Sequence, residues 1–266
     1  VPSVRQNGPL VAEITPRKSL YDLVLPPHVE SVICSLIEEQ NRSELLRSHG
    51  LEPRHRDLLT GPPGNGKTSL AEAVANTLYV PFLVVRYEAL IGSYLGETAQ
   101  RVGQLFDYVR SRECVLFFDE FDVVGKERGD AHETGEIKRV VSSLLLQIDA
   151  LPSYVIVITA SNHPELLDRA VWRRFQLRLE LPMPRAEEIE EWLQRFQLNS
   201  GHDLGVSLQK LSHELESASF AEVEEFAMNV HRRAVLDGPD TNRRKILQDC
   251  LVAWKQMARR NAKQKI

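Results

Sequence analysis

A glycine-rich segment at residues 61–68, GPPGNGKT, constrains the fold of this chain more than any other feature of its sequence. It matches the pattern GxxxxGK(S/T), follows an apolar stretch that ends at Leu59 and precedes an alanine-rich helical stretch. In such a strand-to-helix turn, glycines let backbone N–H groups point at phosphate oxygens, and the positive end of the helix attracts the same anion. An ordinary glycine turn before a helix is the alternative, but it requires neither the lysine nor the threonine. The segment therefore predicts a phosphate-binding loop (P-loop).

The side chains of the P-loop predict what each would contact. Lys67 is expected to meet the β- and γ-phosphates of a nucleotide, and Thr68 is expected to offer its hydroxyl to Mg²⁺. Backbone amides of the same loop are expected to complete the phosphate cradle. The residues assigned to nucleotide binding in this segment are Pro63, Gly64, Asn65, Gly66, Lys67, Thr68 and Ser69.

An acidic pair, Asp119 and Glu120, follows the apolar run at residues 115–118. A buried strand here would deliver both carboxylates to its carboxyl end, where α/β sheets place their ligands. Asp119 would then hold Mg²⁺, largely through water, and Glu120 would orient and deprotonate the attacking water. An acidic turn after a core strand is common by itself, and the upstream P-loop is what favours the catalytic interpretation. Asp122 is interpreted as a solvated or helix-capping acid.

Short apolar stretches alternate with helical stretches through much of the chain. That alternation predicts an α/β fold with a parallel sheet covered by helices. The last apolar stretch, QLRLEL, alternates polar and apolar residues, which is typical of an edge strand with one face in water. Strands are expected near residues 58–59, 82–85, 115–118, 154–159 and 176–181.

Pro182 and Pro184 predict the end of the α/β domain, because the stretches beyond them show only helical periodicity. Ser219, with Glu222 three residues later, is typical of a helix N-cap with a capping box. Residues 1–20 are rich in proline and lack apolar periodicity, so they are interpreted as an extended or flexible lead-in. The predicted organisation is a lead-in at residues 1–20, a large nucleotide-binding domain at residues 21–182 and a small all-helical lid at residues 183–266.

Four motifs occur in the order and approximate spacing of the AAA+ superfamily, namely GPPGNGKT, VLFFDEFD, ITASN and LDRAVWRRF. They look like its narrower AAA branch, and the resemblance extends over residues 21–235. It implies a five-stranded parallel sheet between helices, with a helical lid. It also implies Mg²⁺-dependent hydrolysis of ATP to ADP and phosphate, usually in a ring of six subunits.

The resemblance gives roles to three polar residues downstream. Asn162 matches sensor 1, whose side-chain amide helps to place the lytic water, although an Asx turn before Pro164 is an alternative interpretation. Arg173 and Arg174 match the paired arginine fingers of the AAA branch, which would act on the γ-phosphate bound by the adjacent subunit. A basic loop end on a solvated face is the alternative for these arginines.

The adenine site is also implied by the resemblance. The segment YDLVL looks like the one that contacts adenine through backbone atoms, with Leu23 and Val24 nearest to the base. On the lid side, Ala221 takes the position of sensor 2, where the AAA branch usually has alanine. Two departures are evident, because Phe220 stands where glycine is common and YDLVL lacks the usual glycines.

The segment LIGSYLGE resembles the first pore loop of the family. Tyr94 and Leu95 would then face a central channel and grip a polypeptide. The alternative is that Tyr94 packs on its own helix, since aromatic residues are often buried. The charged stretch at residues 125–136 resembles a second pore loop, or is only a solvated loop.

Composition restricts the partners. The net charge of −4, with acids and bases interspersed, argues against nucleic acid and anionic membranes. The three cysteines are far apart, which indicates a reducing, cytoplasmic environment. The longest apolar runs fall well short of the roughly 18 residues that a membrane span requires.

The favoured function is a protein-remodelling ATPase that forms a ring of copies of itself, expected to be a hexamer. Hydrolysis would drive threading, unfolding or disassembly of a protein substrate. The chain shows no HExxH or GxSxG motif, so a peptidase or other effector would be a separately encoded partner. Two alternatives stay open. One is an AAA+ machine acting on nucleic acid, of the clamp-loader, initiator or helicase type, favoured only by the basic tail after Trp254. The other is a nucleotide-gated scaffold with negligible turnover.

Overall fold

The computed structural model describes residues 3–4, 8–90, 95–122, 134–201, 204–238 and 242–264 of the chain. The chain divides into two compact units. The α/β unit comprises Val1–Pro62 and Gly66–Leu181, and the helical unit comprises Pro63–Asn65 and Pro182–Ile266. Two apolar clusters occupy the two faces of the sheet in the α/β unit, and a third forms the core of the helical unit.

The α/β unit is built around a mixed six-stranded sheet with the strand order β3-β5-β6-β7-β4-β8. Five neighbouring strands, β5, β6, β7, β4 and β8, run parallel to one another, which confirms the predicted class of a parallel α/β sheet. The first strand of the sheet, β3, pairs antiparallel with β5. The strands are β1 Ser3–Val4, β2 Gly8–Pro9, β3 Val11–Ile14, β4 Arg56–Thr60, β5 Phe82–Val85, β6 Cys114–Phe118, β7 Val155–Ser161 and β8 Leu177–Glu180.

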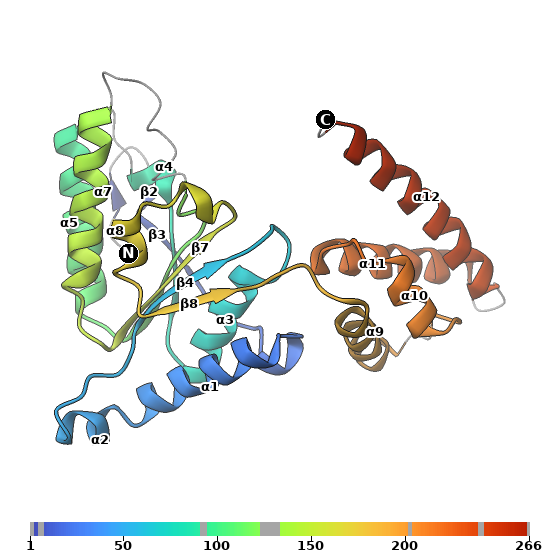
Figure 1. Ribbon diagram of the computed structural model, residues 1–266, viewed down its shortest axis with the longest axis horizontal. Coiled ribbons are helices and arrows are strands. Elements are labelled where there is room, and N and C mark those ends of the chain that lie inside the picture. The colour runs from blue at the N-terminus through green and yellow to red at the C-terminus, as the bar shows by residue number, and fades with distance from the viewer. Residues whose placement is uncertain are drawn as a thin grey trace. The chain divides into compact units, whose positions relative to one another are not determined.

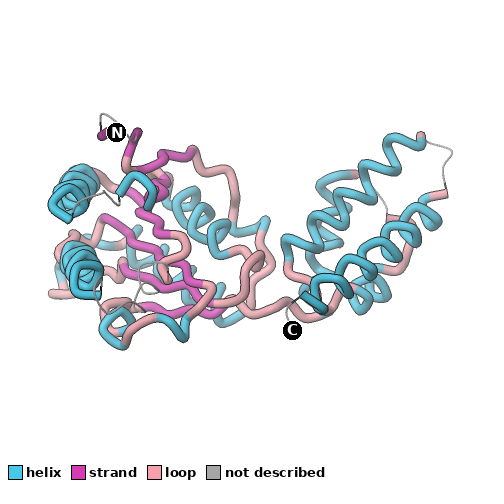
Figure 2. The backbone as a smooth tube through the Cα atoms, turned by 90° about the horizontal axis from the view of Figure 1, so that it is seen from above, coloured by secondary structure: helices cyan, strands magenta, loops and turns pink. Residues whose placement is uncertain are grey.

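Helices cover both faces of this sheet (Figures 1 and 2). Successive strand residues point to opposite faces, so Leu58 of β4 packs with residues of α5 and α7, whereas Leu59 packs with residues of α1 and α3. The helices of the unit are η1 Leu20–Asp22, α1 Pro27–Asn41, α2 Ser43–Ser48, α3 Lys67–Leu78, α4 Tyr87–Leu90, α5 Leu95–Arg110, α7 Thr134–Asp149, η2 Pro164–Leu166 and α8 Arg169–Trp172.

Residues 11–14 belong to the sheet and not to a flexible lead-in. The strand β3 pairs with β5 from Val11 opposite Val85 to Ile14 opposite Phe82. Leu10 and Val11 are 0% and 1% exposed, so they are part of the core. The interpretation of residues 1–20 as a lead-in is therefore wrong for this segment, and the sheet has six strands instead of five. A strand of four residues is too short to show a periodic pattern by itself.

The strand β8 lies at the opposite edge of the sheet, as its alternating sequence predicts. Leu177 and Leu179 are buried, whereas Arg178 and Glu180 are exposed. One face of this strand therefore contributes to the core and the other is in water. The prediction of a half-solvated edge strand is confirmed.

The helical unit contains α9 Ala186–Ser200, α10 Leu208–Glu214, α11 Phe220–Asp237 and α12 Arg243–Gln264. Trp192 and Phe196 stack on one face of α9, with ring centroids 5.4 Å apart. The predicted capping box opens α11, because the Ser219 hydroxyl accepts from the Glu222 N–H and the Glu222 carboxylate accepts from the Ser219 N–H. The buried core of the unit consists of Ile189, Leu193, Leu204, Leu211, Leu215, Ala218, Val223, Phe226, Ala227, Val230, Ile246 and Leu247.

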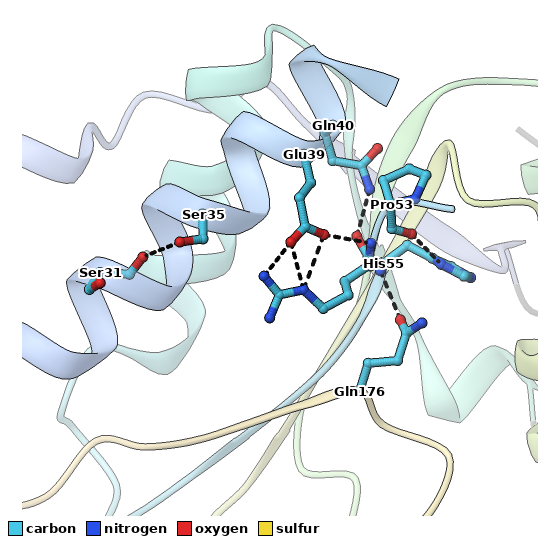
Figure 3. A network of polar contacts seen from close by, with 8 residues as sticks. Ser31, Ser35, Glu39, Gln40, Pro53, His55 and Gln176 are labelled. Carbon is cyan, nitrogen blue, oxygen red and sulfur yellow. Dashed lines mark hydrogen bonds and ion pairs between the residues drawn. The ribbon is translucent and has the colours of Figure 1, made fainter. Parts of the chain in front are cut away.

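A polar network holds the amino end of β4 against α1 and the start of β8 (Figure 3). Arg54 pairs with Glu39 of α1, with Nε 2.8 Å from Oε1. Gln40 Nε2 donates to the Arg54 carbonyl at 2.7 Å. The side-chain oxygen of Gln176 accepts from the His55 N–H at 3.0 Å. These contacts fix where β4 enters the sheet.

Asp57 of β4 is a buried carboxyl close to this network. It is 0% exposed, and neither of its oxygens has a hydrogen-bond partner among the residues that the structure describes. Burial raises the pKa of Asp57 from 3.8 to about 8, although the charge on Arg54 opposes the shift. The carboxyl is thus mostly protonated in the folded chain at neutral pH and ionised in the unfolded chain. Its contribution to stability is fully present below pH 3.8 and is lost as the pH rises to about 8.

The substitution Asp57→Asn keeps the shape of this side chain and removes its titration. We expect the unfolding free energy of the variant, relative to the parent, to rise by about 1.4 kcal/mol per pH unit between pH 5 and pH 7, because only the parent must bind a proton on folding. Denaturant unfolding at several pH values measures this difference. Asp107→Asn is the control, since the side chain of Asp107 is 79% exposed. A difference that stays constant with pH would show that Asp57 is ionised in the fold.

Candidate active site

The P-loop connects the carboxyl end of β4 to the start of α3. Gly61 has a φ of +131°, and a Cβ atom there would lie 2.1 Å from the carbonyl oxygen of Leu181. Gly66 has a φ of +85° and is the N-cap of α3. Only glycine adopts such backbone conformations without strain. The shape of the loop therefore requires these two glycines of the motif.

Lys67 is buried inside the P-loop, with 6% of the residue exposed. Its Nζ donates to the carbonyl oxygens of Gly61 at 2.7 Å and Pro62 at 2.9 Å. Burial lowers the pKa of Lys67, and the charges on Asp119 and Asp122 oppose this shift. The ammonium group is therefore close to two carboxylates at the same edge of the sheet.

Thr68 and Asp119 bring α3 and the end of β6 together. Thr68 Oγ1 donates to Asp119 Oδ2 at 3.0 Å. Hydroxyl and carboxylate oxygens suit Mg²⁺, which is usually held by one or two protein oxygens together with phosphates and water. In the described part of the chain, no group of three or more His, Cys, Asp or Glu side chains could hold a metal by itself. As a hydroxyl and a carboxylate oxygen, the Thr68–Asp119 pair suits an ion whose other ligands are phosphate oxygens and water.

Glu120 follows Asp119 directly and is exposed. Its φ is +47°, a left-handed conformation, and its N–H donates to Asp119 Oδ1 at 2.9 Å. For a residue with a side chain, this conformation costs roughly 1–2 kcal/mol. Such strain persists where the surrounding structure enforces it and is concentrated at functional sites. Glu120 is thus held in a tight turn directly after β6, with its side chain accessible to solvent.

Asn162 follows the end of β7 and is partly buried. Its side-chain oxygen Oδ1 is buried and has no hydrogen-bond partner within the described residues. Buried polar atoms are rarely left unsatisfied in native proteins. This oxygen is therefore a candidate for contact with water or with a bound molecule.

Asp122 is buried, contrary to its interpretation as a solvated or helix-capping acid. It is 4% exposed, and its Oδ1 accepts from Ser161 Oγ at 2.9 Å and from the Asn162 N–H at 3.3 Å. Sequence reasoning missed this residue. The available signal was Phe121, a large apolar residue directly after the acidic pair, which is 1% exposed and keeps the chain in the core.

Arg173 and Arg174 lie beside the amino ends of the parallel strands, which we call the amino edge of the sheet. The P-loop lies at the carboxyl ends, the carboxyl edge. Arg173 is exposed beyond the end of α8. Arg174 donates from Nε to Asp149 Oδ2 at 2.7 Å, and the other oxygen of Asp149 accepts from Arg56 Nη1 at 2.6 Å. Arg56 is the first residue of β4, whereas the P-loop follows the last residue of this strand, Thr60. Five strand residues span about 13 Å between their first and last Cα atoms, so the chain does not bring these arginines to its own P-loop.

The residues assigned to adenine lie in different units. Val24 is 7% exposed, and Leu23 is partly buried against the cluster of α1 and α3. Ala221 is exposed near the start of α11, and its N–H donates to the Gly64 carbonyl at 3.0 Å inside the helical unit.

The pore-loop assignments lie outside the described residues. This applies to Tyr94, to the side chain of Leu95 at the start of α5, and to most of the charged stretch at residues 125–136. Their predicted contact with a polypeptide therefore stays a prediction.

The fold and the P-loop contacts define a nucleoside triphosphatase of the P-loop class. The family model for the ATPase family associated with various cellular activities (AAA) matches residues 58–183. The chain is also 38% identical over 255 residues to the uncharacterized AAA family ATPase y4kL of Sinorhizobium fredii, covering 94% of this chain and 76% of that protein. The chain therefore belongs to the AAA family of ATPases. It binds ATP and hydrolyses it.

Two further relatives are matched over a smaller part of their length. The peroxisomal ATPase pex6 of Schizosaccharomyces pombe is 42% identical over 151 residues, which cover 54% of this chain and 16% of that protein. The proteasome-activating nucleotidase of Methanocella arvoryzae is 33% identical over 216 residues, covering 76% of this chain and 51% of that protein. The chain thus spans about half of one relative and a small part of the other. Among the described helices, none has the length and apolar character to cross a membrane.

Two substitutions are expected to separate binding from hydrolysis. Glu120→Gln should retain ATP affinity and lose hydrolysis, because the amide keeps the size of the side chain and cannot take a proton from water. Lys67→Ala should weaken ATP binding by about 10- to 150-fold, as expected for the loss of a charged hydrogen bond worth roughly 1.5–3 kcal/mol. Equilibrium binding of a fluorescent ATP analogue and phosphate release measure the two quantities. Hydrolysis by Glu120→Gln at the parent rate would exclude Glu120 as the base.

Proposed function

We propose that this chain couples ATP hydrolysis to the unfolding, threading or disassembly of protein substrates, in a ring where arginines of one subunit complete the ATP site of the next. The observation that carries the proposal is the separation of Arg173 and Arg174 from the P-loop of their own chain by the length of β4. Phosphoryl transfer benefits from a cation at the γ-phosphate. A neighbouring subunit can supply that cation where the chain itself does not.

Five side chains at the carboxyl edge of the sheet supply the chemistry in this proposal. Lys67 contacts the β- and γ-phosphates, and Thr68 and Asp119 hold Mg²⁺. When bound, the ion neutralises charge on the phosphate oxygens. Glu120 accepts a proton from the attacking water, and Asn162 orients that water through its side-chain amide. The hydrogen bond of 3.0 Å between Thr68 and Asp119 supports their role at the ion, and the Asn162 side-chain oxygen, which lacks a partner among the described residues, supports the role of Asn162.

The amino edge of the sheet supplies the arginines. Arg174 and Arg56 share the single carboxylate of Asp149, so this cluster keeps a net positive charge. A guanidinium stays charged at physiological pH and can fork onto two phosphate oxygens. The phosphates bound by an adjacent subunit would meet such an edge favourably. A closed ring, a hexamer in the family that the sequence resembles, offers this arrangement to every subunit.

Arg174→Ala should lose most of the assembly-dependent ATPase activity, because a finger arginine can supply about a thousandfold or more in related phosphoryl transfers. The decisive test mixes this variant with Lys67→Ala. Mixed rings should regain part of the activity, since some junctions join an intact P-loop to an intact finger. Arg178→Ala, a change of an exposed arginine on β8, is the control and should hydrolyse ATP like the parent. Lack of recovery in rings shown to be mixed would exclude action between subunits.

The proposal of a protein substrate has two supports. One relative is named for activating the proteasome, and another is named a peroxisomal ATPase. The net charge of −4 also gives no general attraction for nucleic acid. Tyr94 and Leu95 would contact the polypeptide. An aromatic side chain offers a large contact area and loses little conformational entropy on binding, so a ring of them can hold varied sequences. Degradation of a released substrate would need a separately encoded peptidase.

Unfolded protein should therefore stimulate hydrolysis, and single-stranded DNA should not. Tyr94→Ala should abolish this stimulation and leave the basal rate and the unfolding temperature near those of the parent. Tyr79→Ala is the matched control, because Tyr79 is 94% exposed at the end of α3. Stimulation by DNA alone would favour a nucleic-acid machine, and a rate near zero under all conditions would favour a nucleotide-gated scaffold. A loss of several kcal/mol of stability in Tyr94→Ala would identify Tyr94 as a core residue.

A further inference from the structure

Asp122 is a buried carboxylate that the roles proposed above do not use. It is 4% exposed, and within the described residues it forms no ion pair. Burial of a carboxylate is unfavourable unless hydrogen bonds compensate for the lost water. Two donors meet it here, the Ser161 hydroxyl and the Asn162 N–H. These two hydrogen bonds are therefore the contacts that compensate for burying this side chain.

The two hydrogen bonds end on the same atom, Asp122 Oδ1. Ser161 Oγ lies 2.9 Å from it and the Asn162 backbone nitrogen 3.3 Å. The second oxygen of the carboxylate takes part in neither contact. The two donors thus need a single acceptor oxygen at the position of Asp122 Oδ1. The side-chain oxygen of an amide could also provide it.

These contacts join the ends of β6 and β7 beyond their ladder. The last paired residues of the two strands are Phe118 and Thr159. Past that point, the Phe121 N–H donates to the Ala160 carbonyl at 2.8 Å. The Ser161 hydroxyl, which donates to Asp122, also accepts from the His163 N–H at 3.1 Å. Residues 160–163 are therefore held to residues 121–122 by a continuous set of hydrogen bonds.

Asn162 lies in the middle of this set. Asp122 holds its main chain, whereas its side-chain Oδ1 is buried without a partner among the described residues. The direction of a side chain follows from the position of its main chain and Cβ atom. A contact that fixes the backbone of Asn162 therefore also fixes where its amide can reach. A displacement of about 1 Å is enough to cost around a hundredfold in rate when a reacting group must be aligned.

We propose that Asp122 is a positioning residue for ATP hydrolysis, which acts through the Ser161 hydroxyl and the Asn162 backbone to aim the Asn162 amide at the attacking water. The inference rests on the proposed role of Asn162. Asp122 does not touch the nucleotide or the water in this scheme. Its contribution should be visible only while the Asn162 amide is present.

A double-mutant cycle on the full chain tests this, with kcat and KM for ATP measured where activity no longer rises with protein concentration. Asp122→Ala should lower kcat by about 10- to 100-fold with little change in KM. In the background of Asn162→Ala, the same change should have almost no further effect on kcat. Equal losses in both backgrounds would overturn the proposal, since a general effect on folding or charge does not depend on the Asn162 amide.

Asp122→Asn separates hydrogen bonding from charge. Its side-chain oxygen can accept from the same two donors, so it should recover most of the kcat that Asp122→Ala loses. A variant as slow as Asp122→Ala would overturn the proposal and assign the effect to the negative charge, which also lies near Lys67.

Ser161→Ala keeps the charge and removes one of the two hydrogen bonds, so it covers the case in which Asp122→Ala does not fold. Its kcat should fall less than that of Asp122→Ala, with unchanged ADP affinity, and the loss should again vanish in the Asn162→Ala background. A loss that persists there would overturn the proposal. Should Asn162→Ala alone retain the parent kcat, the role of Asn162 fails first, and the dependent role of Asp122 fails with it.

Discussion

The parallel register of β4, β7 and β6 is the constraint on which the active site depends. Leu59 pairs with Ala160, and Phe118 pairs with Thr159, so the three strands end at one edge of the sheet. The P-loop, the acidic turn and Asn162 leave the sheet at those ends. Parallel sheets bind ligands beyond their carboxyl ends for this reason. A slip of one residue would turn each side chain to the other face and dismantle the site.

The two edges of the sheet differ in chemistry. The carboxyl edge combines Lys67 with several carboxylates, whereas the amino edge carries Arg56 and Arg174 around Asp149. The side chains of Arg56, Arg174 and Asp149 are between 20% and 33% exposed. Ion pairs with this access to water contribute little to stability, about 0–1 kcal/mol. The pairs orient the guanidinium groups more than they stabilise the fold. One carboxylate between two arginines leaves the positive charge that the proposed contact with another subunit requires.

Two buried aspartates show that the effect of burial on a carboxyl group depends on its hydrogen-bond partners. Asp122 has two hydrogen-bond donors on one oxygen, and Asp57 has none among the described residues. The partners compensate for the desolvation of Asp122. Without them, burial drives the pKa of Asp57 to about 8, and the side chain is held mostly as the neutral acid. The same residue type thus gives an organising contact in the turn after β6 and a pH-dependent weakness near the amino end of β4.

The sequence by itself determined the elements with local signatures. These are the P-loop, the five parallel strands, the half-solvated edge strand and the capping box at Ser219, and its motifs indicated the AAA ATPases. Glycine, capping residues and periodic burial act over a few residues, so a linear pattern reports them. The tertiary structure alone decided that Asp122 is buried, that residues 11–14 extend the sheet, and that Arg174 contacts Asp149 at the edge opposite the P-loop. Each of these depends on a partner between 25 and 74 residues away, and no local pattern specifies such a partner, because it is chosen only when the strands and helices pack.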